Sequence, residues 1–339
     1  MNFPRLAATR NWVTLAIVSA TIERAVKLDE LSRTVRPVGA DAARPDDPEA
    51  GVPSVGRNAL AKDVFIAAFA AGVGRLVRLD AQLRVEPDAE RLHDARVTVR
   101  RLRSDLRTFR PLVHGPWSDN LRAQLRWLGH VLSEARDADV LLDDISDRAA
   151  QLPSRERATV VALLRPFQEQ RMEAYARVGA ALRSPQYLQL IDALIAAART
   201  PQFRPAAYRR ARTMLARLMR PVWRRLRKQV RRAGSAPHDH DLHRVRIKAK
   251  HARYAAEALA PVASRARRFA KCVTALQTLL GEQHDAVAAY GALRNLRETP
   301  EAAFLAGEIA AAEQADAIDR RGRWRACWRG VCRKERRFW

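Results

Sequence analysis

The sequence predicts an all-α protein whose body repeats one helical unit twice. Three observations support this: few turn-forming residues, apolar residues at helical spacing through most of the chain, and an internal duplication. The 339 residues include only 14 Gly and 17 Pro, and 47% are hydrophobic. This composition argues against an all-β fold and against a disordered chain, and the length allows a sizeable core.

Residues 1–60 are predicted to form an N-terminal segment that ends in a linker. Its apolar stretch, Trp12 to Ile22, is too short to span a membrane and matches a signal peptide poorly, so no transmembrane segment is expected. Residues 35–56 contain four prolines and three glycines, a composition typical of linkers. We therefore assign no function to 1–60 and place one helical domain at 61–339.

That body is predicted to be helical almost throughout. Asp88 is a candidate N-cap, while Pro111, Gly115 and Pro116 are expected to break the chain. Short helical stretches are expected between 184 and 205, and Pro221 lies inside a long helix that it can kink. The expected long helices are about 60–83, 88–109, 118–150, 153–184, 206–232, 241–259, 264–296 and 300 to the C-terminus.

The internal duplication appears in two sequence blocks. HDARVTVRRLR, residues 93–103, aligns with HRVRIKAKHAR, residues 243–253, at an offset of 150. LGHVLSEARD, residues 128–137, aligns with LQTLLGEQHD, residues 276–285, at an offset of 148. Two blocks in the same order at nearly the same offset indicate a repeat. The repeat halves are then about 61–200 and 201–339.

The first block of each half places a row of basic residues on one helix face. In the first half the row spans an arc of about 80° beside an apolar stripe. The rows are His93, Arg96, Arg100, Arg103 and Arg107 in one half, and His243, Arg246, Lys250 and Arg253 in the other. Like charges at these spacings repel, so helix formation does not favour the rows. Cations repeating about every 5–6 Å match an extended chain of phosphates. The alternative is that the cations pair with acids on neighbouring helices.

The overall charge favours polyanionic partners. The chain has 62 Lys and Arg against 37 Asp and Glu, a net charge of +25. The last twenty residues combine nine basic residues with Trp324, Trp328, Phe338 and Trp339, which predicts either base stacking or, preferably, packing into the bundle. A third basic row follows helical steps at Arg210, Arg217, Arg220, Arg224, Arg227 and Arg231.

No cofactor, metal ion or catalytic residue is predicted. Three cysteines, Cys272, Cys327 and Cys332, do not make a disulfide framework and indicate reduced thiols in the cytoplasm. The pairs at 93–94 and 284–285 and the run HDHD at 238–241 suggest a metal-dependent phosphohydrolase as a less favoured alternative. Arginines within two turns of His93 would repel a divalent metal, and the chain lacks a clustered carboxylate set.

The twin H-x-x-R-[VI] helices, each followed by a leucine-rich helix that ends in Arg-Asp or His-Asp, resemble the CHAD family, the conserved histidine α-helical domain. Further matches are RDADV at 136–140, Arg253-Tyr254 and Phe338-Trp339. The resemblance covers about 60–339. It implies two pseudo-symmetric helical bundles with a basic groove between them. It also implies non-catalytic binding of long-chain inorganic polyphosphate, often with targeting to polyphosphate granules in the cytoplasm.

The resemblance also implies a ligand set, carried over position by position. This set is His93, Arg96, Arg100, Arg103, His243, Arg246, Lys250 and Arg253, with Arg136 added from the second block. The chain departs from the family pattern at His251-Ala252 and at His284, which stands where the first half has Arg136.

Beside polyphosphate binding, one further possibility is set aside and one remains. Many relatives carry a triphosphatase domain that opens with Glu-x-Glu-x-Lys, but the stretch from Glu23 to Lys27 has a single glutamate, so that activity is not assigned. The charge also permits unspecific binding of nucleic acid or of an anionic surface, without a motif that reads base edges.

Overall fold

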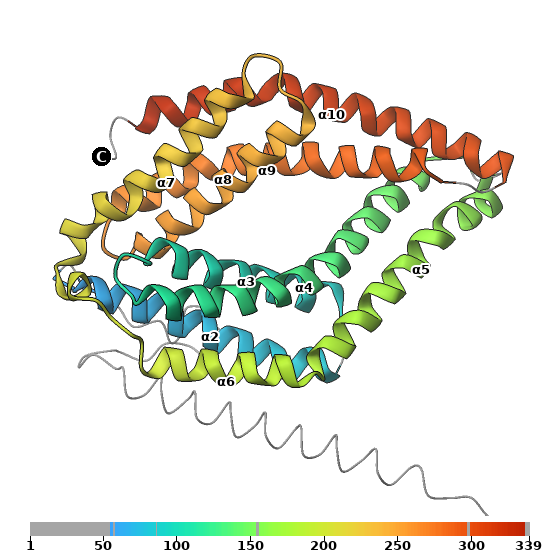
Figure 1. Cartoon of the computed structure of the whole chain (residues 1–339). Coiled ribbons are helices and arrows are strands. Elements are labelled where there is room, and N and C mark those ends of the chain that lie inside the picture. Colours follow the sequence, from blue (N-terminus) through green and yellow to red (C-terminus); the bar gives the residue numbers. More distant parts are fainter. Residues whose placement is uncertain (1–54, 57, 86, 154–155, 297–298, 336–339) are drawn as a thin grey trace, which may run out of the picture.

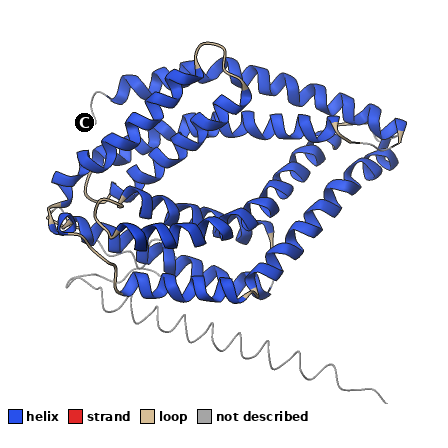
Figure 2. Ribbon diagram, viewed as in Figure 1, coloured by secondary structure: helices blue, strands red, loops and turns tan. Residues whose placement is uncertain are grey.

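Long helices build the structure, a computed structural model that describes residues 55–56, 58–85, 87–153, 156–296 and 299–335 (Figures 1 and 2). The predicted all-α class is confirmed, because the described residues form helices and only two isolated β-bridges. The helices are α2 (Ala61–Val85), α3 (Ala89–Thr108), α4 (Gly115–Ala149), α5 (Arg157–Leu182), α6 (Pro185–Arg199), α7 (Ala211–Ala233), α8 (Asp239–Leu259), α9 (Ser264–Arg294) and α10 (Pro300–Glu335). A short 3-10 helix, η2, covers Pro205–Tyr208.

The helix boundaries follow the sequence closely at most positions. Asp88 caps α3 as predicted, since its carboxylate accepts a hydrogen bond of 2.7 Å from the backbone N–H of Arg91. The predicted break at Gly115 and Pro116 is wrong, because α4 begins at Gly115. Pro116 lies in the first turn of α4, where a residue needs no N–H donor. Helix α7 runs through Pro221 as one helix.

Helix α7 starts later than predicted because a distant segment holds its N-terminal approach. The backbone N–H of Ala61 donates to the Arg209 carbonyl at 2.8 Å, and the N–H of Ala211 donates to the Ala59 carbonyl at 2.9 Å. This pairing, seen as the bridge between Leu60 and Arg210, keeps the chain extended there. The predicted single helix over 206–232 is therefore a 3-10 turn, a short extended link and α7.

Both halves contain four helices that pack in chain order. Helices α2, α3, α4 and α5 each pack on the next, and α7, α8, α9 and α10 do the same, while α6 lies beside α2 and α4. The halves meet where α3 contacts α8 and α4 contacts α9. In Figure 1, α4 and α5 run together with α9 and α10 to a shared far end of the molecule. Helix α6 of the first half has no counterpart among the described residues of the second half, and the duplication itself stays a prediction.

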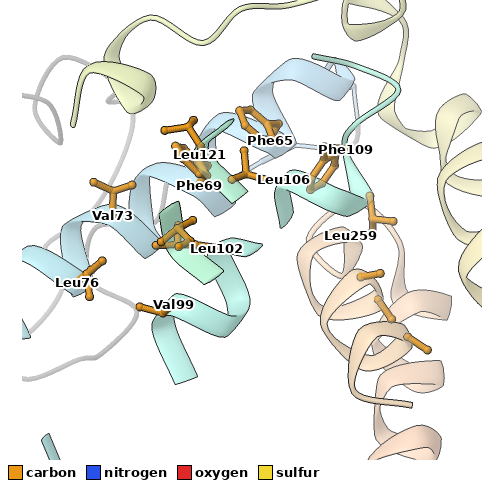
Figure 3. Close-up of a cluster of buried hydrophobic side chains, with 14 of the residues drawn as sticks. Phe65, Phe69, Val73, Leu76, Val99, Leu102, Leu106, Phe109, Leu121 and Leu259 are labelled. Carbon is orange, nitrogen blue, oxygen red and sulfur yellow. The ribbon is translucent and has the colours of Figure 1, made fainter. Parts of the chain in front are cut away.

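The apolar stripe of α3 lies in the larger of two hydrophobic cores. Figure 3 shows Leu102 and Leu106 of α3 beside Phe69 of α2, and all three are fully buried. Phe65 stacks on Phe69 with ring centroids 5.2 Å apart. A smaller core closes the far end, built from residues of α4, α5, α9 and α10 that include Ile145, Leu163, Phe167, Leu293, Leu305 and Ile309. Burial of this stripe fixes the direction in which the neighbouring basic row of α3 points.

The C-terminal aromatic residues pack in the bundle, as preferred above. Trp324 is 2% exposed, and Trp328 stacks on Trp223 of α7 with ring centroids 5.4 Å apart. Phe338 and Trp339, like most of the segment 1–60, lie outside the described residues. Cys272 and Cys327 are free thiols. Among the described helices, none has the length and apolar character needed to cross a bilayer.

Candidate anion-binding site

The first half contributes a basic row that is anchored by hydrogen bonds. Arg96 is largely buried, and its Nε donates to the Ser133 hydroxyl of α4 at 3.0 Å. Its terminal nitrogen donates to Asp137 at 3.1 Å. One turn later, the Nε of Arg100 donates to the hydroxyl of Tyr254 at 2.9 Å, across the boundary between the halves. Both guanidinium groups are thus held in place by named acceptors.

The second half contributes a basic row with fewer partners. Arg246 has a side chain that is 15% exposed, and its nearest carboxylate oxygen, on Asp285, is 3.8 Å away. The buried Nε of Arg246 has no hydrogen-bond partner among the residues that the structure describes. His243 lies against His284 of α9, with 3.3 Å between their Nδ1 atoms.

The two rows meet in one electrostatic cluster. Burial and the charges of Arg246, Arg100 and Arg96, in that order, lower the pKa of Lys250 to about 7. Burial also lowers the pKa of Arg96, whose neighbours include Asp137, Arg100, Arg246 and Arg136. The carboxylates that act on Arg96, Arg246 and Lys250 are those of Asp137 and Asp285. We call the following residues the central cluster: His93, Arg96, Arg100, Arg136, His243, Arg246 and Lys250.

The histidines of this region are biased toward the neutral form. Burial, followed by the neighbouring arginines, lowers the pKa of both His93 and His243 below the usual range. Burial, Arg246 and His243 lower the pKa of His284 to about 4. A neutral imidazole keeps one N–H donor. At neutral pH these rings therefore offer hydrogen bonds to an anion without adding charge.

Two of the nine predicted ligand residues lie outside the central cluster. Arg103 faces α4, where its neighbours are Arg126 and Arg122, and Arg107 lies one turn further along α3. Arg253 has its Nε 2.9 Å from a Glu257 oxygen and its guanidinium over the Tyr254 ring at 5.1 Å. The partner of Arg253 is thus an acid one turn away on the same helix. The alternative considered above, pairing with an acid on a neighbouring helix, applies instead to Arg96 and Asp137 of α4.

Sequence reasoning missed Tyr254 as the link between the halves. Its hydroxyl accepts from Arg100, and its ring lies beneath the guanidinium groups of Arg100, Arg101 and Arg253 at 5.1–5.7 Å. Such contacts add cation–π attraction. Ser133 was also missed, although it lies four residues before Asp137 and therefore on the same face of α4. The four-residue spacing from Asp137 could therefore have identified Ser133 as a residue facing the same arginine.

Contacts between the two motif helices are related by the repeat offset. A terminal nitrogen of Arg101 lies 3.2 Å from a Glu257 oxygen, and one of Arg107 lies 3.1 Å from Nδ1 of His251. Residues 101 and 107 correspond to 251 and 257 at the offset of 150. Each contact is thus the counterpart of the other, which is the pattern that a two-fold relation produces.

The described residues hold no group of three or more His, Cys, Asp and Glu side chains placed to bind a metal ion. His238 stands at the N-cap position of α8 and makes no side-chain capping hydrogen bond. Asp239 accepts a hydrogen bond of 2.7 Å from Gln283 of α9 and pairs with Arg321 of α10. The HDHD run thus starts α8 and ties it to its neighbours.

Comparison with known protein families identifies the fold. The sequence model of the CHAD domain family matches residues 67–294, a range that includes both motif helices and the helices that follow them. The chain belongs to the CHAD family. All residues of the central cluster lie within the range that the CHAD family model matches.

Curated proteins and solved structures are also similar to this chain. Two uncharacterized proteins of Mycobacterium tuberculosis, MT2285 and Rv2226, are each 32% identical over 222 residues, which is 63% of this chain and 40% of theirs. PptA from Streptomyces chartreusis is similar in structure, with a TM-score of 0.66 and 22% identity, over 80% of this chain and 100% of that one. The crystal structure of the CHAD domain from the plant Ricinus communis gives a TM-score of 0.63 and 26% identity, over 86% and 97%.

Proposed function

We propose that this CHAD domain binds long-chain inorganic polyphosphate without catalysing a reaction on it. One observation carries the proposal: basic residues of α3 and α8, one hundred and fifty residues apart, converge in one cluster with few carboxylates. Buried cations that lack counterions cost folding free energy. A chain of phosphates supplies the missing negative charge, and membership in the CHAD family supports the same ligand.

The geometry suggests how such a chain is held. Arg96 and Arg246 direct guanidinium groups from opposite halves and form charge-assisted hydrogen bonds with successive phosphates. Lys250 takes up a proton when a polyanion approaches, because negative charge raises its pKa above about 7. The neutral imidazoles of His93 and His243 donate to phosphate oxygens. Binding releases counterions from the polymer, so affinity falls steeply with salt.

Charge reversal in the central cluster tests the proposal. Arg100→Glu and Lys250→Glu each replace attraction by repulsion, and we expect each to weaken polyphosphate binding at least 100-fold, about 2.7 kcal/mol or more. Arg165→Glu on α5 is the matched control, because this arginine is 76% exposed and belongs to no cluster described above. Circular dichroism verifies that each variant is folded. Wild-type affinity in a folded Arg100→Glu/Lys250→Glu double variant would refute the site.

The alternative of unspecific polyanion binding has its own supporting observation. Helix α7 exposes a long row of arginines, Arg217, Arg220, Arg224, Arg227 and Arg231. Such a row suits any phosphate backbone or anionic surface. Competition between polyphosphate and DNA at equal phosphate concentration, at two salt concentrations, separates the two functions. A CHAD domain with the proposed site prefers polyphosphate at both.

The absence of catalysis is also part of the proposal. With Mg²⁺, Mn²⁺ or Zn²⁺ present, we expect no phosphate release from polyphosphate or tripolyphosphate. Metal-dependent release that disappears in His93→Ala would favour the phosphohydrolase alternative instead.

We further propose that polyphosphate binding directs the protein to polyphosphate granules in the cytoplasm. A fluorescent fusion is then expected to form foci that coincide with granules in wild type. The same fusion carrying Arg100→Glu is expected to be diffuse, whereas foci that persist would assign targeting to another surface.

A further inference from the structure

A separate basic cavity lies between α3, α7 and α8, outside the central cluster. Its volume is about 250 Å³. The basic residues come from three helices and from the segments that follow α3 and α6. They are Arg107, Arg110, Arg204, Arg217, Arg225 and Lys248. None of the described residues that line the cavity is acidic. None of them belongs to the central cluster either.

These cations act on one another inside the cavity. Burial, followed by Arg225 and Arg122, lowers the pKa of Arg107. Burial, followed by Arg107 and Arg225, lowers the pKa of Lys248. Arg107 and Lys248 are therefore destabilised by neighbouring cations, whereas Arg110 is paired with Asp119 at 2.6 Å. A bound anion of several charges removes this repulsion and stabilises the folded protein by the free energy of its binding.

The remaining lining residues supply hydrogen-bonding groups and walls. His251, whose pKa burial and Arg107 lower to about 3, is neutral and shares a contact of 3.1 Å with Arg107. The hydroxyls of Ser104 and Thr108 also line the cavity, and Pro221 and Val222 of α7 form an apolar wall. A small number of polar groups on partly apolar walls is typical of a ligand pocket rather than of a flat charged surface.

The size of the cavity restricts the ligand. Pockets for drug-sized molecules enclose roughly 300–1,000 Å³. A volume of about 250 Å³ suits a compact anion, held at a mouth where Arg110, Arg204, Arg217 and Arg225 are exposed. The number of arginines exceeds what one orthophosphate requires, since each arginine can make a two-pronged contact with phosphate oxygens.

From this geometry we propose that the cavity binds a short condensed phosphate, a pyrophosphate or tripolyphosphate unit. The unit is either a free anion or the end of a long polyphosphate chain. The proposal does not rest on the function proposed for the central cluster, because the two sets of residues are different. It makes the CHAD domain a protein with two phosphate sites of different length preference.

Isothermal titration calorimetry with tripolyphosphate tests the cavity. The double variant Arg225→Ala/Lys248→Ala removes two lining cations. The matched control is Arg224→Ala/Arg244→Ala, which removes two exposed cations from adjacent turns of the same helices, neither of which lines the cavity. We expect at least about tenfold weaker binding in the cavity variant, as expected for the loss of hydrogen bonds to a charged ligand, and less than a twofold change in the control.

Two results would overturn the proposal. One is an unchanged affinity in the folded cavity variant, and the other is an equal loss in both variants, which would indicate general surface attraction. Thermal unfolding supplies a second readout: tripolyphosphate is expected to raise the Tm of wild type and of the control, but not of the cavity variant. Equal increases in all three would contradict a cavity site.

The central-cluster variant Arg100→Glu/Lys250→Glu separates this proposal from the previous one. It is expected to keep its tripolyphosphate site while losing the long polymer. If it loses tripolyphosphate while Arg225→Ala/Lys248→Ala keeps it, the short anion binds in the central cluster and the cavity proposal is wrong.

Competition by saturating long polyphosphate then identifies the source of the unit. Displacement of tripolyphosphate indicates a chain end in the cavity, and undisturbed binding indicates a free anion; both support the site.

Discussion

The two halves of the central cluster use equivalent positions differently. In the first half, Arg96 Nε donates to Ser133. The position equivalent to Ser133 in the second half is Gly281, whose Cα lacks a side chain to accept from Arg246, and a Cβ built there would lie 3.6 Å from Arg246 Nε. This single difference explains why Arg96 has an acceptor and the Nε of Arg246 has none among the described residues.

Two more positions extend the difference. Arg136 in the first half is replaced by His284, which is neutral at pH 7 because its pKa is about 4. Arg100, which is bound to Tyr254, is replaced by Lys250, whose pKa is about 7. The arginines of the first half are therefore pre-organised by hydrogen bonds, to Ser133 within that half and to Tyr254 of the other half. The second half retains unsatisfied or titratable groups and gains more from a bound anion.

The largest expected effect follows from the unsatisfied guanidinium. Arg246→Ala is expected to weaken polyphosphate binding by about 2–3 kcal/mol, 30- to 150-fold, because its guanidinium charge is offset only by a carboxylate oxygen 3.8 Å away. Arg96→Ala is expected to cost about 1 kcal/mol less, because Asp137 and Ser133 already use part of that group. Calorimetry on both variants at one salt concentration measures the difference. A larger loss in Arg96→Ala would reverse the comparison.

The titration of Lys250 gives the second effect. Its pKa in the free protein is about 7, below the usual 10.5, and a bound polyanion raises it. Binding therefore takes up a proton above pH 7, and affinity is expected to fall as pH rises from 7 to 8.5, by up to about tenfold per pH unit. Affinities at pH 6, 7 and 8.5 measure this.

Lys250→Arg supplies the control for that titration, since arginine stays charged throughout the range. The affinity of Lys250→Arg is expected to change little between pH 7 and 8.5, once the titration of the polymer's end groups is subtracted. A profile as steep as that of wild type would assign the proton to another group.

A third prediction makes the second half resemble the first. His284→Arg introduces the cation that Arg136 provides in the other half. We expect polyphosphate affinity to rise about three- to tenfold and the log–log salt dependence to steepen by about 0.7, the value for one additional phosphate contact on a single strand. Binding isotherms at three salt concentrations measure both. An unchanged slope would show that position 284 does not reach the ligand.

The smallest effect concerns Gly281. Gly281→Ser supplies the missing acceptor for Arg246, and its Cβ has room, with contacts of 3.6 and 3.7 Å. We expect about 0.5–1 kcal/mol of added stability, from helix propensity and the new hydrogen bond, with less than a threefold change in affinity. Urea unfolding measures the stability. Destabilisation would indicate that the Arg246 side chain is not placed as described.

Much of the fold follows from local sequence signals. The two motif helices, the Asp88 cap and the buried stripe of α3 all follow from periodicity and capping within one element. The start of α7 does not, because it depends on pairing between residues 59–61 and 209–211, which are far apart in the chain. The start of α4 at Gly115 was open to local prediction, because a proline is favoured in the first turn of a helix, and the expected start near 118 lies three residues too late.

In the candidate site too, features set within one helix could be predicted, whereas features set by packing between helices could not. Helical spacing correctly predicts that His93, Arg96 and Arg100 share a face. It does not predict that Arg103, one step later, turns toward Arg122 and Arg126 of α4, because that depends on how α3 crosses α4. The role of Tyr254 depends on the packing of α3 against α8, which a single helix pattern does not contain.

The central claim is that both halves form one site for one polymer chain. The most direct measurement is the stoichiometry and affinity of long polyphosphate binding in wild type, Arg100→Glu, Lys250→Glu and the double variant, measured by calorimetry. The account predicts one binding event per CHAD domain, which either single variant largely removes, so that the double variant loses little more. Two independent events, with each single variant removing one and leaving the other at wild-type affinity, would contradict it.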